Sequence, residues 1–202
     1  MRRIWISWRI ALKNFLACRF RIDMQIHNLS INGSFFVEFD EFKDERGLFV
    51  KTFNRNLFEG TSLASFSTEE EFFTISNKNV LRGLHFQTPP AEHNKFVYCI
   101  NGQVSDVLFD LRKESTTYGR HCVIELDSSR MAGVYIPKGI AHGFLSRADN
   151  STLIYKVDSG YDPGNDMGLR WDSCGINWDV KKPILSDRDQ QFPSFSEYLS
   201  PF

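Results

Sequence analysis

From residue 35 onward the sequence is a series of short apolar runs separated by turn-forming residues. Runs rich in Phe, Val, Ile and Tyr are typical of β-strands, and the 19 Phe residues favour pleated, half-buried surfaces. Many short strands with turns between them predict a closed barrel or a double-sheet jelly roll, an all-β fold. The strands are expected at 35–42, 48–53, 72–75, 95–100, 104–111, 123–126, 134–136 and 153–157.

Local signals between these runs predict turns and a few short helices. Asn101-Gly102 lies between two expected strands and predicts a β-hairpin, because both central residues of such a turn need φ > 0. The segment 44–47 predicts a second turn. Short helices are expected within 56–65 and 195–199, and the rest of the C-terminal part predicts loops.

The size and charge of the chain limit its class. A length of 202 residues suits one domain with a sizeable core. The formal net charge of −1 shows no basic excess of the kind that binds nucleic acid, and no apolar run reaches the length of a membrane span. The four cysteines match neither a disulfide framework nor a zinc pattern, which predicts reduced thiols in a cytoplasmic protein: Cys18, Cys99, Cys122 and Cys174.

Residues 1–22 differ from the rest because they contain basic side chains and no acid. Apolar residues from Ile4 to Leu16 recur at helical spacing, which predicts a basic amphipathic helix. An interfacial membrane anchor and an organelle transit peptide are two interpretations of such a helix. We favour a third, upstream translation before a functional start at Met24. We therefore expect 1–23 to be an extension outside the fold and 24–202 to be a single domain.

The histidines that could carry chemistry lie in the middle of the chain. His142 ends a Pro-x-Gly-x-x-His segment, which resembles half of a metal-binding cupin signature. The other half would place a second histidine two residues from His85, where Gly83 and Gln87 stand instead. Since a zinc or iron site needs three converging protein ligands, this chain is predicted to bind no metal.

Five segments together resemble one known family. They are LRGLHFQ (81–87), NKFVYCINGQVSDVLFDLRKESTTYG (94–119), YIPKGIAHGF (135–144), STLIYKVDSGY (151–161) and LSDRD (185–189). In this order they resemble the RmlC family of nucleotide-sugar 3,5-epimerases, typified by dTDP-4-dehydrorhamnose 3,5-epimerase, from about residue 35 to about residue 193. The resemblance implies a cupin-type jelly roll, a homodimer and no cofactor. It also implies 3- and/or 5-epimerisation of a nucleotide-linked 4-keto-6-deoxyhexose in deoxysugar and surface polysaccharide biosynthesis.

The resemblance also assigns roles that suit inversion of a carbon beside a ketone. One group must remove the C–H proton and another must return a proton from the opposite face. His85 matches the family's base, Asp189 its partner, Lys95 the cation at the enolate oxygen, and Tyr155 the acid. The resemblance also assigns substrate-binding roles to Arg82, His142 and Tyr161 of the same motifs and to Arg46 and Phe49 of the upstream Arg-Gly-x-Phe turn.

Strand geometry makes one further prediction within the first motif. Arg82 and His85 are three residues apart, so strict alternation would put their side chains on opposite faces of a strand. If both line one pocket, Gly83 must mark a bulge or bend.

The chain departs from the family pattern where the nucleotide is read. Lys51 follows the Arg-Gly-x-Phe turn where many dTDP-specific members have an acid, and 69–73 lacks their Gln-x-Asn pair. The nucleotide and the inverted carbon therefore stay open. Two other classes also stay open, a metal-dependent cupin enzyme and an inactive nucleotide-sugar-binding module.

Overall fold

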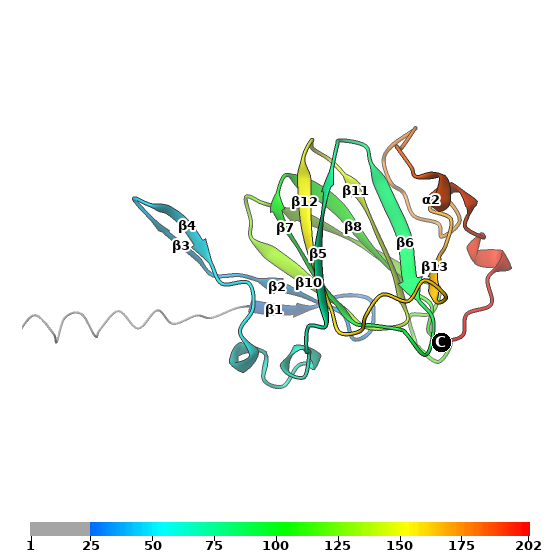
Figure 1. Ribbon diagram of the computed structural model, residues 1–202, viewed down its shortest axis with the longest axis horizontal. Helices are drawn as coiled ribbons and strands as arrows, with labels where there is room; N and C mark the ends of the chain where they lie inside the picture. The colour runs from blue at the N-terminus through cyan, green and yellow to red at the C-terminus, as the bar shows by residue number, and fades with distance from the viewer. Residues whose placement is uncertain (1–24) are drawn as a thin grey trace, which may run out of the picture.

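The computed structural model describes residues 25–202 and contains two facing β-sheets that form a jelly roll (Figure 1). The strands of the first sheet are, in spatial order, β1 (Gln25–Asn28), β2 (Phe35–Glu38), β10 (Ala132–Ile136), β7 (Lys95–Asn101), β12 (Ser151–Val157) and β5 (Glu70–Ser76). Those of the second are β13 (Asp166–Gly168), β6 (Leu81–Gln87), β11 (Ile140–Ser146), β8 (Gln103–Asp110) and β9 (His121–Asp127). The expected all-β jelly roll is confirmed.

Both faces of the six-stranded sheet are covered, which explains the many phenylalanines. Along β7, Val97 and Cys99 pack between the two sheets, whereas Phe96 and Tyr98 pack on the outer face. Two 3₁₀-helices, η1 (Arg55–Phe58) and η2 (Ser62–Ala64), cover that outer face and bury Phe58 and Leu63 there. A strand buried on both sides reads as a continuous apolar run, as β7 does.

The C-terminal segment packs on the outer face of the five-stranded sheet. It contains a short helix α2 (Asp187–Gln191) and the 3₁₀-helix η3 (Phe195–Glu197). Leu84 and Phe109 of the sheet share an apolar cluster with Trp178 and Phe195 of this segment. This packing fixes α2 against β6, which matters for the site below.

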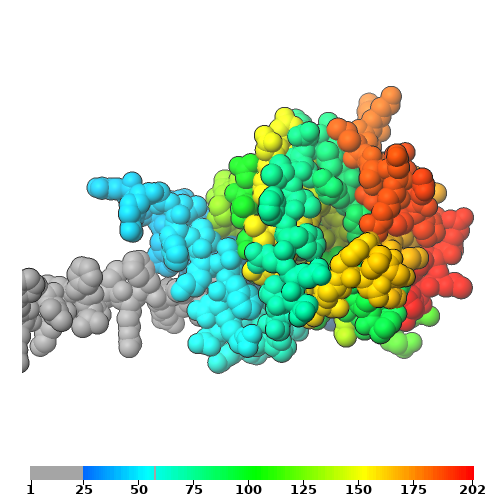
Figure 2. Space-filling view, viewed as in Figure 1, coloured from blue at the N-terminus to red at the C-terminus, as the bar shows by residue number. Residues whose placement is uncertain are grey.

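Strands β3 (Glu41–Asp44) and β4 (Gly47–Val50) form a separate two-stranded arm. Figures 1 and 2 show the arm standing out from the body of the molecule. The expected run 35–42 is thus two strands, and the buried Phe39 between them donates its backbone N–H to the Met131 carbonyl. The predicted turn at 44–47 is present, with Gly47 at a φ of +118°.

Most expected strands are confirmed within a few residues, and the short helices expected within 56–65 and 195–199 are present as the 3₁₀-helices η1, η2 and η3. One prediction from a local pattern is wrong. Asn101-Gly102 is not a hairpin turn, because β7 and β8 belong to different sheets and only Gly102 of the pair has a positive φ, of +77°. The chain crosses between the sheets here, and Gly102 lies against Ser151 with no room for a Cβ.

The predicted irregularity at Gly83 is confirmed. Gly83 has a φ of +125°, and the β6–β11 register shifts between His142 and Phe144. A Cβ at Gly83 would lie 2.5 Å from the Cα of Gly143, so glycine lets the two strands approach closely. As a result Arg82 and His85 line the same cavity.

The predicted N-terminal amphipathic helix lies outside the described residues. Between residues 25 and 202, none of the helices combines the length and the apolar character that a bilayer crossing needs.

Candidate active site

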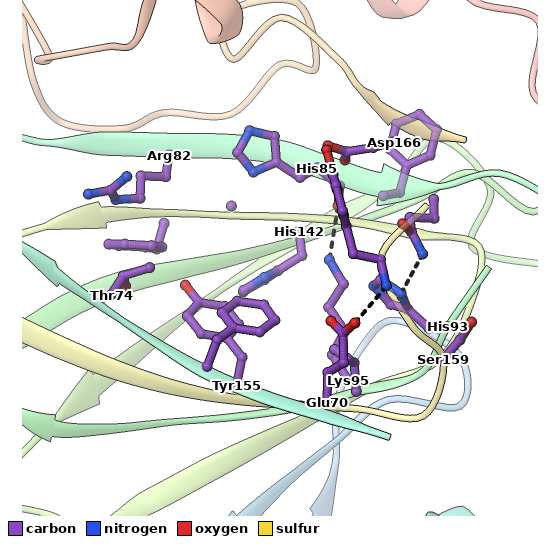
Figure 3. Close-up of a pocket in the computed structure, with 17 residues that line it drawn as sticks. Glu70, Thr74, Arg82, His85, His93, Lys95, His142, Tyr155, Ser159 and Asp166 are labelled. Carbon is purple, nitrogen blue, oxygen red and sulfur yellow. Dashed lines mark hydrogen bonds between the residues drawn. The ribbon is translucent and has the colours of Figure 1, made fainter. Parts of the chain in front are cut away.

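A cavity of about 430 Å³ opens between the two sheets (Figure 3). This volume is within the usual range for small-molecule sites. Side chains of β5, β7 and β12 line it from one sheet, and those of β6, β11 and β13 line it from the other. The polar residues around it are Glu70, Thr74, Arg82, His85, Gln87, His93, Lys95, His142, Tyr155, Ser159, Tyr161 and Asp166.

His85 projects from β6 into the cavity and is held from behind by Asp189 of α2. Its Nε2 lies 2.8 Å from Asp189 Oδ1, and the other carboxylate oxygen accepts the backbone N–H of Gly83 at 3.2 Å. Asp189 is buried, which raises its pKa, but the hydrogen bonds from His85, Gly83 and Ser186 outweigh this and lower it overall. The carboxylate thus stays ionised and fixes the orientation of the imidazole ring.

Lys95 is the first residue of β7 and lies close to His85. Its Nζ donates a hydrogen bond to the His85 carbonyl oxygen at 3.2 Å, and the residue is 9% exposed. Burial lowers the pKa of the ammonium to about 8, against the opposing effect of Asp166 and Asp106. Near neutral pH the site therefore contains a desolvated positive charge, which interacts more strongly with an anion than a hydrated one does.

Tyr155 lies on β12, in the sheet opposite His85. Its side chain is buried, and burial together with the Asp106 charge raises the pKa of the phenol above its ordinary value. The hydroxyl is therefore protonated at neutral pH and is available as a proton donor.

Arg82 and His142 supply further hydrogen-bonding groups. His142 lies opposite His85 in the β6–β11 register, and its Nε2 is 2.7 Å from Asp106 Oδ1 in a fully buried pair. Arg82 is exposed, and its Nε donates a hydrogen bond to Ser76 Oγ at 3.1 Å. Both side chains line the cavity and suit an anionic ligand.

The structure brings together most of the predicted site residues, but not all of them. His85, Lys95, Tyr155, Arg82, His142 and Tyr161 line the cavity, and Asp189 lies directly behind it. Arg46 and Phe49 lie in the β3–β4 arm and do not line this cavity. There the Arg46 guanidinium pairs with Asp44, and Phe49 is 60% exposed.

The cavity also contains residues that the sequence analysis did not single out. His93, expected at the surface, lines it, and burial and the nearby Lys95 lower the pKa of this imidazole to about 3. Its position two residues before Lys95 was a usable signal, because alternate residues of an extended segment share a face. Asp166 belongs to the short strand β13, and Asp106 of β8 does not line the cavity but forms a hydrogen bond with His142, so neither had a local signal.

Within the described part of the chain, no group of three His, Cys, Asp or Glu side chains is arranged to hold a metal ion. The chemistry that these side chains support is proton transfer. The oriented imidazole of His85 and the protonated phenol of Tyr155 come from opposite sheets, and the buried ammonium of Lys95 contacts the strand that carries His85. The fold and site thus define an acid–base enzyme built in a jelly roll.

Comparison with known proteins agrees with this class. The family model described as dTDP-4-dehydrorhamnose 3,5-epimerase matches residues 28–197. The Shigella flexneri protein named dTDP-4-dehydrorhamnose 3,5-epimerase is 37% identical over 150 residues, 73% of this chain and 83% of its own.

Two solved structures have the same fold. One is NovW of Streptomyces spheroides, a 4-keto-6-deoxy sugar epimerase, with 33% identity, a TM-score of 0.81, and coverage of 86% of this chain and 88% of its own. The other is the Legionella pneumophila RmlC in complex with dTDP-4-keto-L-rhamnose, with 29% identity, a TM-score of 0.79, and coverage of 86% and 94%. The chain belongs to the dTDP-4-dehydrorhamnose 3,5-epimerase family, a family of isomerases.

Proposed function

We propose that the domain 24–202 inverts C3, C5 or both in a nucleoside-diphosphate-linked 4-keto-6-deoxyhexose, without a metal or other cofactor, in deoxysugar biosynthesis. The names of the relatives support dTDP as the nucleotide. The free thiols of Cys99, Cys122 and Cys174 support a reducing compartment, and we place the enzyme in the cytoplasm.

The observation that carries this proposal is the placement of His85 and Tyr155 on opposite sheets, facing one cavity. Inversion at carbon needs a base on one face of the sugar ring and an acid on the other. His85, oriented by Asp189, takes the proton as the C–H bond breaks, and the electron pair moves toward the C4 oxygen. Tyr155 then gives its hydroxyl proton to the carbanionic carbon from the other face. Proton exchange with solvent restores both groups.

The charge that develops on the C4 oxygen needs a fixed positive partner. Lys95 is buried beside the base and supplies this charge, with Arg82 assisting. His142 and Arg82 also suit the diphosphate. Tyr161, which is 63% exposed at the rim, suits a position near the nucleotide.

Arg46 and Phe49 fit a substrate-binding role if the protein is a homodimer. The arm stands out from the body of the molecule (Figure 1). It does not line its own cavity, and Leu48 and Phe49 of β4 are exposed apolar side chains. In a two-fold dimer the arm of one protomer reaches the cavity of the other, and each site is completed by both chains.

Proton NMR in D₂O tests the proposed reaction. The purified protein is given 4-keto-6-deoxy sugars linked to dTDP, CDP, GDP and UDP, and deuterium at C3 and C5 is followed together with inversion. We expect His85→Ala to lower uptake by about 10²- to 10⁴-fold, the usual contribution of a general base. Tyr155→Phe should keep uptake, because His85 still exchanges the proton, but lose inversion.

Folded wild-type protein that exchanges no sugar of the panel would overturn the proposed function. Equal turnover in wild type and His85→Ala would overturn the assignment of the base.

A further inference from the structure

Strand β5 contributes side chains to the cavity that the proposed mechanism does not use. Its alternate residues Glu70, Phe72 and Thr74 face the cavity, whereas Phe73 between them faces away from it. In the β5–β12 register Phe72 lies directly opposite Tyr155. The pair of rings is stacked, with centroids 4.9 Å apart and an interplanar angle of 11°.

Phe72 is half-exposed although Tyr155 beneath it is buried. The exposed fractions are 46% and 7%, so one face of the Phe72 ring covers the phenol and the other is open. A large apolar side chain left half-exposed at a site contributes less to the core than a buried one does. Here the Phe72 ring keeps water from one face of the Tyr155 ring.

The stack also limits where the phenol can lie. Among the described residues, strand β5 is the edge of its sheet and pairs with β12 alone, so this cross-strand pair joins the edge to the strand that carries Tyr155. On another side, the His142 ring lies at 64° to the Tyr155 ring with centroids 6.0 Å apart. The phenol ring is thus held between Phe72 and His142.

We infer that Phe72 is a positioning residue: by stacking on Tyr155 it holds the proton donor over the cavity, so that the enolate is protonated from the inverting face. This inference rests on the proposed function. The enolate has two fates. Tyr155 can break its O–H bond to form the C–H bond on the inverting face, or protonated His85 can return a proton to the original face.

In D₂O the two fates are distinguishable in one NMR experiment. Return from His85 places deuterium on carbon without inversion, because its imidazole proton exchanges with solvent. Delivery from Tyr155 places deuterium with inversion. The ratio of uptake with inversion to uptake without inversion therefore measures the position of the donor, and it does not depend on the concentration of active enzyme.

We expect Phe72→Ala to lower this ratio by roughly two- to tenfold, the factor that a stacked aromatic pair is worth. Phe72→Tyr keeps a stacked ring and should restore the ratio. Phe73→Ala is the matched control, since it removes an equal ring from the same strand on the opposite face, where its register partner is Ile154. It should leave the ratio at the wild-type value.

A ratio unchanged in Phe72→Ala, or lowered equally in Phe73→Ala, would overturn the inference while the proposed function stands. Absence of uptake in the wild type would instead overturn the proposed function.

Discussion

Lys95 shows how one buried side chain sets the conditions under which the site works. Its ammonium touches the His85 carbonyl and has lost most of its water, which lowers its pKa to about 8. Asp166 and Asp106 oppose this shift without pairing directly with the ammonium. A lysine tuned in this way is charged at neutral pH but close to losing its proton.

The pH dependence of kcat/KM should report this lysine. The lowered pKa means that Lys95 loses its proton as pH rises through about 8, so the charge needed at the enolate oxygen disappears above that value. We expect kcat/KM to fall on an alkaline limb with a midpoint near 8. Lys95→Arg should remove this limb, even at a lower rate, because a guanidinium stays charged over the accessible pH range.

Lys138→Arg is the control for that experiment, because Lys138 is exposed and pairs with Glu92 away from the cavity. It should keep the alkaline limb. A limb that survives in Lys95→Arg would show that another group titrates there.

At the scale of elements, the contact between β6 and β11 places His85 opposite His142. The two strands approach so closely at Gly83 and Gly143 that neither position has room for a side chain. The positive φ of Gly83 turns the strand, so that Arg82 and His85 both reach the cavity despite their odd spacing.

Gly83→Ala should therefore destabilise the protein and displace the base. The new Cβ would meet Gly143 Cα at 2.5 Å and the His142 carbonyl oxygen at 2.9 Å, in a backbone conformation that favours glycine. We expect the free energy of unfolding, measured with urea, to fall by about 3 kcal/mol, with loss of deuterium uptake. Gly160→Ala meets its nearest atom at 3.5 Å and should change stability by less than about 0.5 kcal/mol. Equal losses in both variants would contradict this account of Gly83.

The same elements show what the sequence could predict. The apolar runs located β7, β8 and β12 because burial on one or both faces leaves a pattern in the chain. The spacing of Arg82 and His85 even predicted the bend at Gly83. Strands β6 and β11 were recognised only as motifs, because their glycines and histidines interrupt the apolar pattern. The β-hairpin predicted at Asn101-Gly102 is wrong, because local residues do not reveal which sheet the next strand joins. Asp106 and Phe72 depend on neighbours distant in sequence, and the fold alone brings these together, whereas the position of His93 two residues before Lys95 offered a local signal.

At the scale of the whole molecule, the position of the β3–β4 arm has no explanation within a single chain. Arg46 lies in the turn of the arm and the exposed Phe49 lies in β4, whereas the cavity lies in the body between the sheets. In the dimer that we propose, the arm of one chain contacts the cavity of the other, which would explain both the exposed arm and its distance from its own cavity and would make each site depend on two chains.

Mixing two inactive variants tests this arrangement. His85→Ala removes the base from the cavity, and a double Arg46→Ala, Phe49→Ala variant removes the arm's contacts. After unfolding and refolding together, half of the dimers should be mixed, and each mixed dimer has one site with an intact cavity and an intact arm. We expect roughly a quarter of the wild-type uptake from the mixture, although each variant alone is nearly inactive. In the control, His85→Ala is mixed with Tyr155→Ala. Both substitutions lie in the cavity, so every cavity of a mixed dimer is defective, whichever chain supplies the arm. If the first mixture stays as inactive as the control, the arm serves its own chain. If the double arm variant is active on its own, the arm does not contact the substrate.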